Sequence, residues 1–161
     1  VETKEPAEVE IEVQVHGMTA MFQSKRRLIG NYFNYQGRNM KVDDLEADGH
    51  LFLHDPERNT KYPIFEDENG THIMSPNDIC IIDELMEMVE AGVDSFKIDG
   101  VLKKPEYLIG VTKLYRKAID LCAEDPDAYE DVKDSLLEEA ESLQPENRMF
   151  DTGFFFKETV Y

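Results

Sequence analysis

The segment AGVDSFKIDG, residues 91–100, carries the first residues that suggest chemistry. Lys97 lies within the short apolar run SFKI, and Asp99 follows it. Because side chains alternate along a strand, Lys97 and Asp99 are predicted to face away from Phe96 and Ile98. A cation beside an acid at the C-terminal end of such a strand could hold a carboxylate or phosphate. A structural lysine paired beneath a loop fits the same pattern, so both interpretations stay open.

A possible acid–base pair lies on an earlier predicted strand, EVEIEVQVHG, in which apolar and polar residues alternate. Glu12 and His16 are four residues apart and would share one face of a regular strand. If that face lines a site, the two could act as general acid and base. The alternative is that Glu12 is a solvated carboxylate and His16 a hydrogen-bonded residue at the strand end.

Basic residues cluster at Lys25, Arg26 and Arg27, with Arg38 and Lys41 further on. Such a cluster can contact RNA phosphates. A solvated helix face or a contact with a protein partner explains it equally well, so Arg26 and Arg27 are candidate substrate-binding residues only.

A metal site is a weaker possibility at the two histidines of the next segment. His50 and His54 stand beside Asp48 and Asp55, but the run is typical of a strand and turn and lacks a third ligand at a suitable spacing. We therefore predict no metal site. Protease signatures such as GxSxG and HExxH are absent from the sequence.

Composition indicates a folded, acidic protein. The chain has 161 residues, 41% of them hydrophobic, with 17 basic and 35 acidic residues and a net charge of −18. This charge repels phosphate backbones and, taken alone, argues against the chain binding nucleic acid by itself. The absence of a long apolar run or signal peptide and the two separated cysteines predict a cytoplasmic protein with reduced, buried thiols and no membrane contact. The acidic start without a methionine suggests a piece of a longer protein.

The elements that must position these residues alternate between strand and helix, which is typical of an α/β fold. We expect a strand to end at His16-Gly17, the stretch 18–35 to start as a short helix at Met18, and a small antiparallel meander in 37–75. A helix should begin at Ser75-Pro76 and end at Gly92, ahead of the strand SFKI. Two long helices are expected at 105–122 and 127–143.

Four blocks carry a resemblance to a known family: EVQVHG, SPNDICIIDELMEMVEAGVDSFKIDG, PEYLIGVTKLYRKAID and NRMFDTGFFF. In this order they resemble the C-terminal part of the collagenase-like peptidases, the U32 peptidases. The resemblance implies a partial TIM-type barrel formed by 1–36 and 76–161, with 37–75 as a β-meander inserted into it. It also makes Arg148, in the last block, a candidate substrate-binding residue.

The resemblance implies two activities. Some members are described as peptidases acting on collagen-like substrates, and others take part in prephenate-dependent hydroxylation of the transfer RNA wobble uridine and carry an iron–sulfur cluster. In the latter, cysteines follow the valine-histidine-glycine strand end. Here Ala20 and Arg27 stand at the first two of those positions, and YQGRNMKVDD lacks the later pair. Ligation of a cluster by four thiolates is therefore not possible in this chain.

We therefore expect a cysteine-less member that serves as an accessory or paralogous subunit beside a cysteine-bearing partner, with transfer RNA as a possible ligand. A peptidase of unknown catalytic type and a non-catalytic partner-binding scaffold are the alternatives, and whether the chain is itself catalytic stays open. Incomplete barrel edges would favour self-association of this piece.

Overall fold

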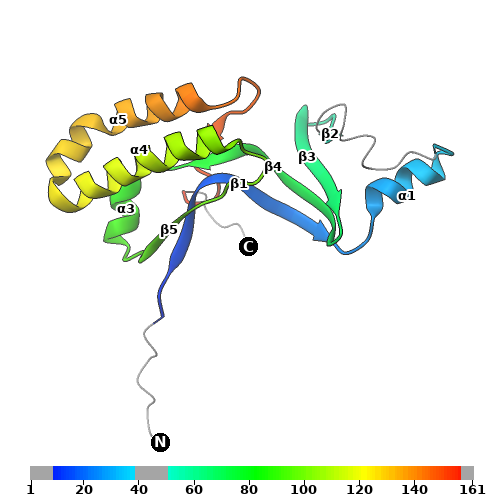
Figure 1. Ribbon diagram of the computed structural model, residues 1–161, viewed down its shortest axis with the longest axis horizontal. Coiled ribbons are helices and arrows are strands. Elements are labelled where there is room, and N and C mark those ends of the chain that lie inside the picture. The colour runs from blue at the N-terminus through cyan, green and yellow to red at the C-terminus, as the bar shows by residue number, and fades with distance from the viewer. Residues whose placement is uncertain (1–8, 39–50, 157–161) are drawn as a thin grey trace, which may run out of the picture. The chain divides into compact units, whose positions relative to one another are not determined.

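The computed structural model describes residues 9–38 and 51–156, which form an α/β fold (Figure 1). Among these residues, a mixed sheet of six strands is accompanied by four helices. The strands are β1 (Glu12–Ser24), β2 (Leu51–Asp55), β3 (Thr60–Asp67), β4 (Gly70–Cys80), β5 (Ser95–Ile98) and β6 (Phe150–Asp151). The helices are α1 (Leu28–Tyr35), α3 (Leu85–Glu90), α4 (Pro105–Glu124) and α5 (Pro126–Leu143).

The chain divides into two compact units. The first contains the described residues up to Gly17 and from Ile79 onward, and the second contains Met18–Asp78. Hydrogen bonds connect the strands in the order β2-β3-β4-β1-β5, and β6 pairs with β4. The α/β class predicted from the sequence is confirmed, whereas the described strands do not define a TIM-type barrel.

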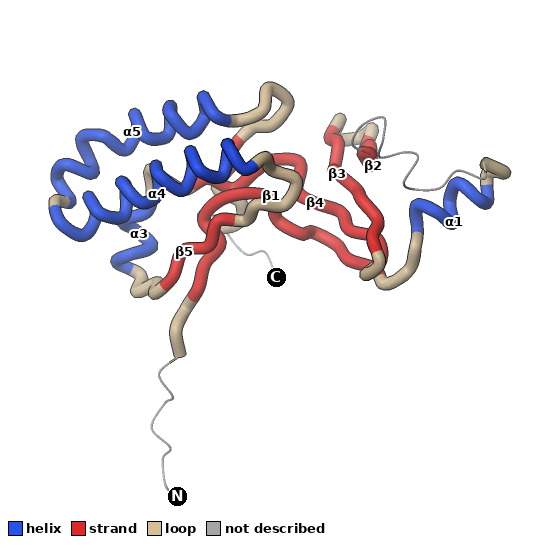
Figure 2. Tube along the Cα trace, viewed as in Figure 1, coloured by secondary structure: helices blue, strands red, loops and turns tan. Residues whose placement is uncertain are grey.

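The first unit contains β1 as far as Gly17, the parallel strand β5 and the helices α3, α4 and α5 (Figure 2). Helix α4 begins with Pro105 at its first turn, where a missing N–H costs nothing, and packs along α5. Its inner stripe, including Val111 and Ala118, is fully buried in the core of the unit. Phe96 and Ile98 of β5 pack against this core, so the helices cover that face of the strand pair.

The described residues of the second unit form an antiparallel meander and one short helix. Strand β3 pairs antiparallel with β2 and with β4 in the stretch where the sequence predicts a meander. The N–H of Thr19 donates to Ser75 Oγ, and Gly70 lies against Ser24, so β1 and β4 run in opposite directions here. Helix α1 packs on β3 through its buried Ile29. The predicted boundaries of an insertion at 37–75 stay a prediction.

Two predicted helices are wrong at their beginnings. The helix expected from Ser75-Pro76 is strand as far as Cys80, and helix begins only at Leu85. Ser75 Oγ donates to the Asn77 carbonyl and accepts from Thr19, so this serine links two strands instead of capping a helix. The residues after Gly17 likewise continue β1 to Ser24.

The long helices and both cysteines agree with the sequence analysis. Helices α4 and α5 match the predicted ranges within two residues. Cys80 and Cys122 are free and buried, as predicted, although Cys80 lies at the end of a strand and not in a helix.

Candidate functional site

The C-terminal end of β5 is held by backbone contacts to the middle of β1, where the parallel pairing of the two strands stops. The N–H of Asp99 donates to the carbonyl oxygen of His16 over 2.9 Å. Gly17 follows with φ +102°, and a Cβ at this position would overlap the carbonyl oxygen of Asp99. Only glycine permits this approach, so β1 at Gly17 and the end of β5 form a tight, fixed edge.

Lys97 and Asp99 are brought together at this edge. Lys97 Nζ lies 3.6 Å from Asp99 Oδ2, and the lysine side chain is half exposed. The other carboxylate oxygen of Asp99 accepts the N–H of Val101, which orients it. Lys97 stands opposite Gln14 in the strand register and faces away from the core-packed Phe96 and Ile98, as the alternation predicts. The pair offers an ammonium group with remaining donor capacity for an anionic ligand.

Glu12 and His16 do not share a face, and this expectation is wrong. The register between β1 and β5 shifts between Gln14 and His16, and such an irregularity turns the following side chain over. Glu12 stays exposed and accepts the hydroxyl of Ser95, whereas the His16 side chain is fully buried. An acid–base pair between them is therefore not formed in this arrangement.

His16 instead lies among aromatic residues beneath α4. Its Nδ1 is 3.3 Å from the hydroxyl of Tyr115, and its Nε2 is 2.7 Å from that of Tyr107. Tyr115 also donates to the Val15 carbonyl oxygen, and Tyr107 donates to Gln144 Oε1. The ring of Phe150 also contacts the imidazole of His16 in an edge-on arrangement. Burial raises the pKa of Tyr115 well above its ordinary value, which keeps the hydroxyl protonated.

Sequence reasoning missed these tyrosines. Tyr107 and Tyr115 are eight residues apart and lie on one side of α4. This spacing, after a strand ending in histidine, was the available signal. The tyrosine hydroxyls satisfy the buried imidazole and leave it facing the helices, so His16 serves to hold the strand end against α4.

The thiols are poor nucleophiles in this environment. Burial raises the pKa of Cys80 to about 11, and burial also raises the pKa of Cys122. At neutral pH both stay protonated, whereas the thiolate is the reactive form. They also do not fit a four-thiolate cluster, because only two are present in the chain.

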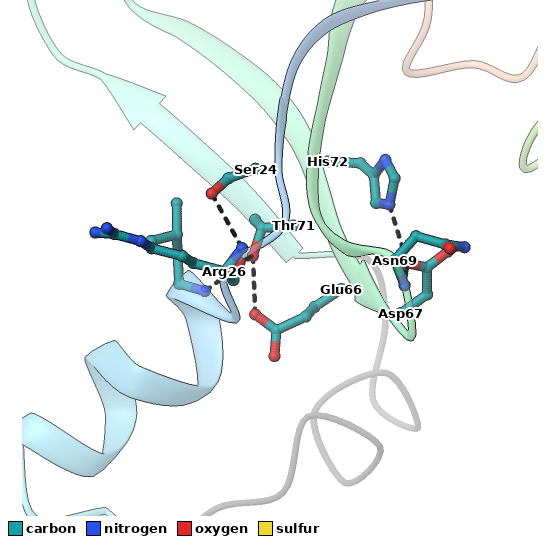
Figure 3. A network of polar contacts seen from close by, with 8 residues as sticks. Ser24, Arg26, Glu66, Asp67, Asn69, Thr71 and His72 are labelled. Atoms are coloured by element: carbon teal, nitrogen blue, oxygen red, sulfur yellow. Dashed lines mark hydrogen bonds and ion pairs between the residues drawn. The ribbon is translucent and has the colours of Figure 1, made fainter.

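A second candidate surface is the bend between β1 and α1, which carries Lys25, Arg26 and Arg27. Residues 25–27 are exposed and precede α1, so the alternative that they lie on a solvated helix face is wrong. Ser24 Oγ accepts the N–H of Arg26, and Thr71 Oγ1 donates to its carbonyl oxygen (Figure 3). The guanidinium group of Arg26 points away from this network (Figure 3).

A buried glutamate fixes the start of α1, and sequence reasoning also missed it. Glu66 Oε2 accepts the N–H of Ile29 over 3.0 Å and contacts Thr71 Oγ1 over 2.9 Å. Thr71 Oγ1 accepts the N–H of Leu28. Arg27, at the N-cap position, makes no capping hydrogen bond with its side chain, so Glu66 of β3 and Thr71 of β4 supply the acceptors instead. The negative charge of Glu66 at the N-terminus of a helix is also favourable. The bend and the helix are held in one conformation.

The remaining candidates are dispersed. Arg148 is partly buried in the turn before β6, where its N–H donates to the Pro145 carbonyl. Within residues 9–38 and 51–156, no group of three or more histidine, cysteine or carboxylate side chains could hold a metal ion. His54 lies on β2, whereas Lys41, Asp48 and His50 lie outside the described residues.

An α/β unit with a rigid edge between parallel strands, combined with a β-meander, is the class of structure that these observations define. The model of Peptidase family U32 matches residues 2–160, and the chain belongs to this family. The resemblance inferred from the sequence blocks is confirmed.

Several curated relatives are named for tRNA hydroxylation, and others are named as a protease or a collagenase. The chain is 70% identical, over all 161 residues, to the tRNA hydroxylation protein P2 of Bacillus subtilis, of which it covers 52%. It is 29% identical to tRNA hydroxylation protein P1 of the same organism, matching 96% of the chain and 36% of that protein. A collagenase of Porphyromonas gingivalis is 41% identical over 54 residues, 34% of the chain and 15% of the collagenase. The chain therefore spans about half the length of the P2 protein and a smaller share of the P1 protein and the collagenase.

Two further comparisons bear on the described part of the chain. No solved structure matches it significantly. None of the helices in the described residues has the length and apolar character that crossing a bilayer requires.

Proposed function

We propose that this chain is part of a P2-type tRNA hydroxylation protein, an accessory or paralogous subunit in prephenate-dependent hydroxylation of the wobble uridine. The single observation that supports this proposal is the 70% identity to the B. subtilis protein P2 across the whole chain. Identity to P1 is only 29%, so the chain belongs with the P2 type and not with P1. The collagenase of P. gingivalis matches only about a third of this chain. It therefore supports the peptidase alternative less strongly than the P2 protein supports a role in tRNA hydroxylation.

The proposed partner is a cysteine-bearing paralogue of the P1 type. Ala20 and Arg27 occupy positions where the resemblance expects cluster cysteines, and the two thiols present are buried and protonated. This chain then contributes no ligand to an iron–sulfur cluster, and the partner would supply that chemistry. Both subunits would act in the cytoplasm, where their transfer RNA substrate is found.

Lys97 and Asp99 are the residues we propose for anion binding at the strand edge. The ammonium group is half exposed, and its carboxylate partner lies 3.6 Å away, a distance that leaves donors available for a second anion. The paired strands present Gln14 and Lys97 on the face opposite the helices. In a TIM-type barrel this is the inner face, so we propose that the remaining half of a P2-type protein completes a barrel over it. The exposed face of the isolated piece would favour self-association.

The test is a chimera in which this chain replaces the matching residues of the B. subtilis protein P2. The chimera is expressed in a strain that lacks P2, and hydroxylated uridine in total transfer RNA is measured by mass spectrometry of nucleosides. The proposal expects loss of hydroxylation in the strain and recovery with the chimera. A graft of the matching P1 residues is the control and should not restore it.

The same strain separates the alternatives. Unchanged hydroxylation without P2, together with gelatin cleavage by the purified chimera, would establish the peptidase instead. A scaffold without a ligand site should tolerate Lys97→Ala, whereas anion binding predicts a hydroxylation defect of about tenfold or more, since charged hydrogen bonds contribute roughly 1.5–3 kcal/mol. Lys113→Ala changes an exposed lysine on α4 and is the matched control.

A further inference from the structure

We propose that the bend 25–27 and the outer face of α1 form a surface that binds unpaired nucleotides of RNA. This inference rests on the proposed function and assigns the RNA contact to a defined part of the second unit. We call it the α1 surface and define it by Lys25, Arg26, Arg27, Tyr32 and Tyr35.

The first argument is the charge of this segment. Residues 18–42 contain five of the 17 basic residues of the chain and none of the 35 acidic ones. The rest of the sequence is strongly acidic, so the segment is a local exception that complements a polyanion. Within the described residues, no carboxylate lies within ion-pair distance of Lys25, Arg26, Arg27 or Arg38, and all four are exposed. Their charges are thus available to phosphates.

The second argument is the aromatic content of the outer face of α1. Ile29 is buried and Phe33, four residues on, is partly buried, so this side of the helix packs on β3. Tyr32 and Tyr35, three residues apart on the helix, are 57% and 91% exposed. Exposed tyrosines next to cations are the combination that single-stranded nucleic acids use, because bases stack on the rings while phosphates meet the charges.

The third argument is rigidity. Glu66 and Thr71 accept the first N–H groups of α1, and Ser24 and Thr71 hold the backbone of Arg26 (Figure 3). A surface fixed before binding loses less conformational entropy in the complex. The caps come from strands β3 and β4, so the sheet holds the cations and the first turn of the helix together.

A duplex fits this surface less well than a loop. The bases of a duplex are stacked on each other and offer no free faces to Tyr32 and Tyr35, whereas the splayed bases of a loop do. An acidic protein partner would use the same cations but gains nothing specific from base-sized stacking platforms. We therefore commit to unpaired RNA.

The experiment uses the P2 chimera and three fluorescent RNAs: a transcribed transfer RNA, its isolated anticodon stem-loop, and a blunt duplex of equal length. Binding is measured by anisotropy at several salt concentrations. We expect the stem-loop to bind better than the duplex. Arg26→Glu with Arg27→Glu should weaken stem-loop binding at least about tenfold and flatten the salt dependence, because each lost phosphate contact lowers the slope by about 0.7.

The stacking argument has its own variants. Tyr32→Ala with Tyr35→Ala should weaken stem-loop binding about 5- to 100-fold, while Tyr32→Phe with Tyr35→Phe should bind like the parent, since a phenyl ring still stacks. Lys113→Glu with Lys117→Glu makes the same charge change on exposed positions of α4 and should leave binding unchanged.

Each contrary outcome has a distinct interpretation. If the chimera restores hydroxylation and binds RNA but the α1 variants bind equally well, the inference is wrong and the proposed function stands. If the variants retain RNA binding but no longer co-elute with the P1 protein in size exclusion, the surface is a protein interface. If the parent chimera neither restores hydroxylation nor binds transfer RNA, the proposed function fails first.

Discussion

Tyrosine has opposite environments in the two units of this protein. In the first unit, Tyr115 and Tyr129 are almost fully buried, and their hydroxyls bond backbone groups of neighbouring segments. In the second unit, Tyr32 and Tyr35 expose most of their surface. A tyrosine stabilises a fold through the apolar surface that it buries. The exposed surface of Tyr32 and Tyr35 contributes little to the fold and is accessible to a ligand. The comparison separates residues that hold the fold from residues available for binding.

The largest expected effect is on stability in the first unit. Tyr115→Ala in the chimera removes a buried ring and leaves the Ile81 N–H and the Val15 carbonyl oxygen without this partner. We expect a loss of about 3–5 kcal/mol in the free energy of unfolding, measured by denaturant titration. Tyr35→Ala, at a position 91% exposed, should leave the midpoint unchanged.

Tyr115→Phe sharpens this prediction because it keeps the ring and removes only the hydroxyl. The expected loss is about 1–3 kcal/mol, the cost of leaving buried polar groups unpaired. Equal midpoints for Tyr115→Phe and the parent would show that the hydroxyl network around His16 does not stabilise the strand end.

The next effect concerns two glycines with positive φ, one in each unit. Gly17→Ala places a Cβ against the Asp99 carbonyl oxygen at φ +102°, whereas Gly37, at φ +72°, has nothing within 4 Å of its added Cβ. Both substitutions carry left-handed strain, but only the first forces β1 and the end of β5 apart. We expect Gly17→Ala to cost about 1–3 kcal/mol more than Gly37→Ala in thermal unfolding of the chimera. Equal melting temperatures would contradict the tight edge.

Prediction from the sequence succeeded where the pattern of apolar residues repeats over a long stretch. Buried positions recur from Tyr107 to Cys122 in α4 and from Tyr129 to Ala140 in α5, and the SFKI strand is bounded by turns. It failed at Ser75-Pro76, because a serine-proline pair has the same local signal whether it caps a helix or joins strands. It also failed for Glu12 and His16, because the register shift in β1 depends on pairing with β5, which no local pattern records.

The candidate site shows the same limit. The charges of Lys97, Arg26 and Arg27 are evident in the sequence, and so is the lysine's alternation with Phe96 and Ile98. Their partners are distant in the chain: Glu66 caps a helix that begins 38 residues earlier, and Tyr115 contacts a histidine 99 residues before it. Such pairings arise from tertiary packing and have no spacing that a single sequence reveals.

A smaller effect tests whether the second unit is held ready for binding. Glu66→Ala removes the acceptor of the Ile29 N–H and should cost about 1 kcal/mol, as loss of a helix cap does. Hydrogen exchange of residues 28–35 in the chimera should become faster while α4 is unaffected. Glu68→Ala, at an exposed position in the next turn, is the control and should leave exchange in α1 unchanged. Faster exchange in both variants would mean that Glu66 has no specific role in α1.

The smallest effect is a pH dependence in the first unit. Burial raises the pKa of Asp83, and the nearby Asp134 adds to the rise, so the folded protein binds this proton more readily than the unfolded chain does. Stability then falls as pH rises from the unfolded value, about 3.9, through the raised folded value. Asp83→Asn should therefore raise the melting temperature of the chimera at pH 7, and its advantage should shrink as pH falls toward 4. Asp131→Asn removes an exposed charge of the same sign from α5. If it raises the melting temperature equally, the gain comes from the net charge of −18 and not from the burial of Asp83.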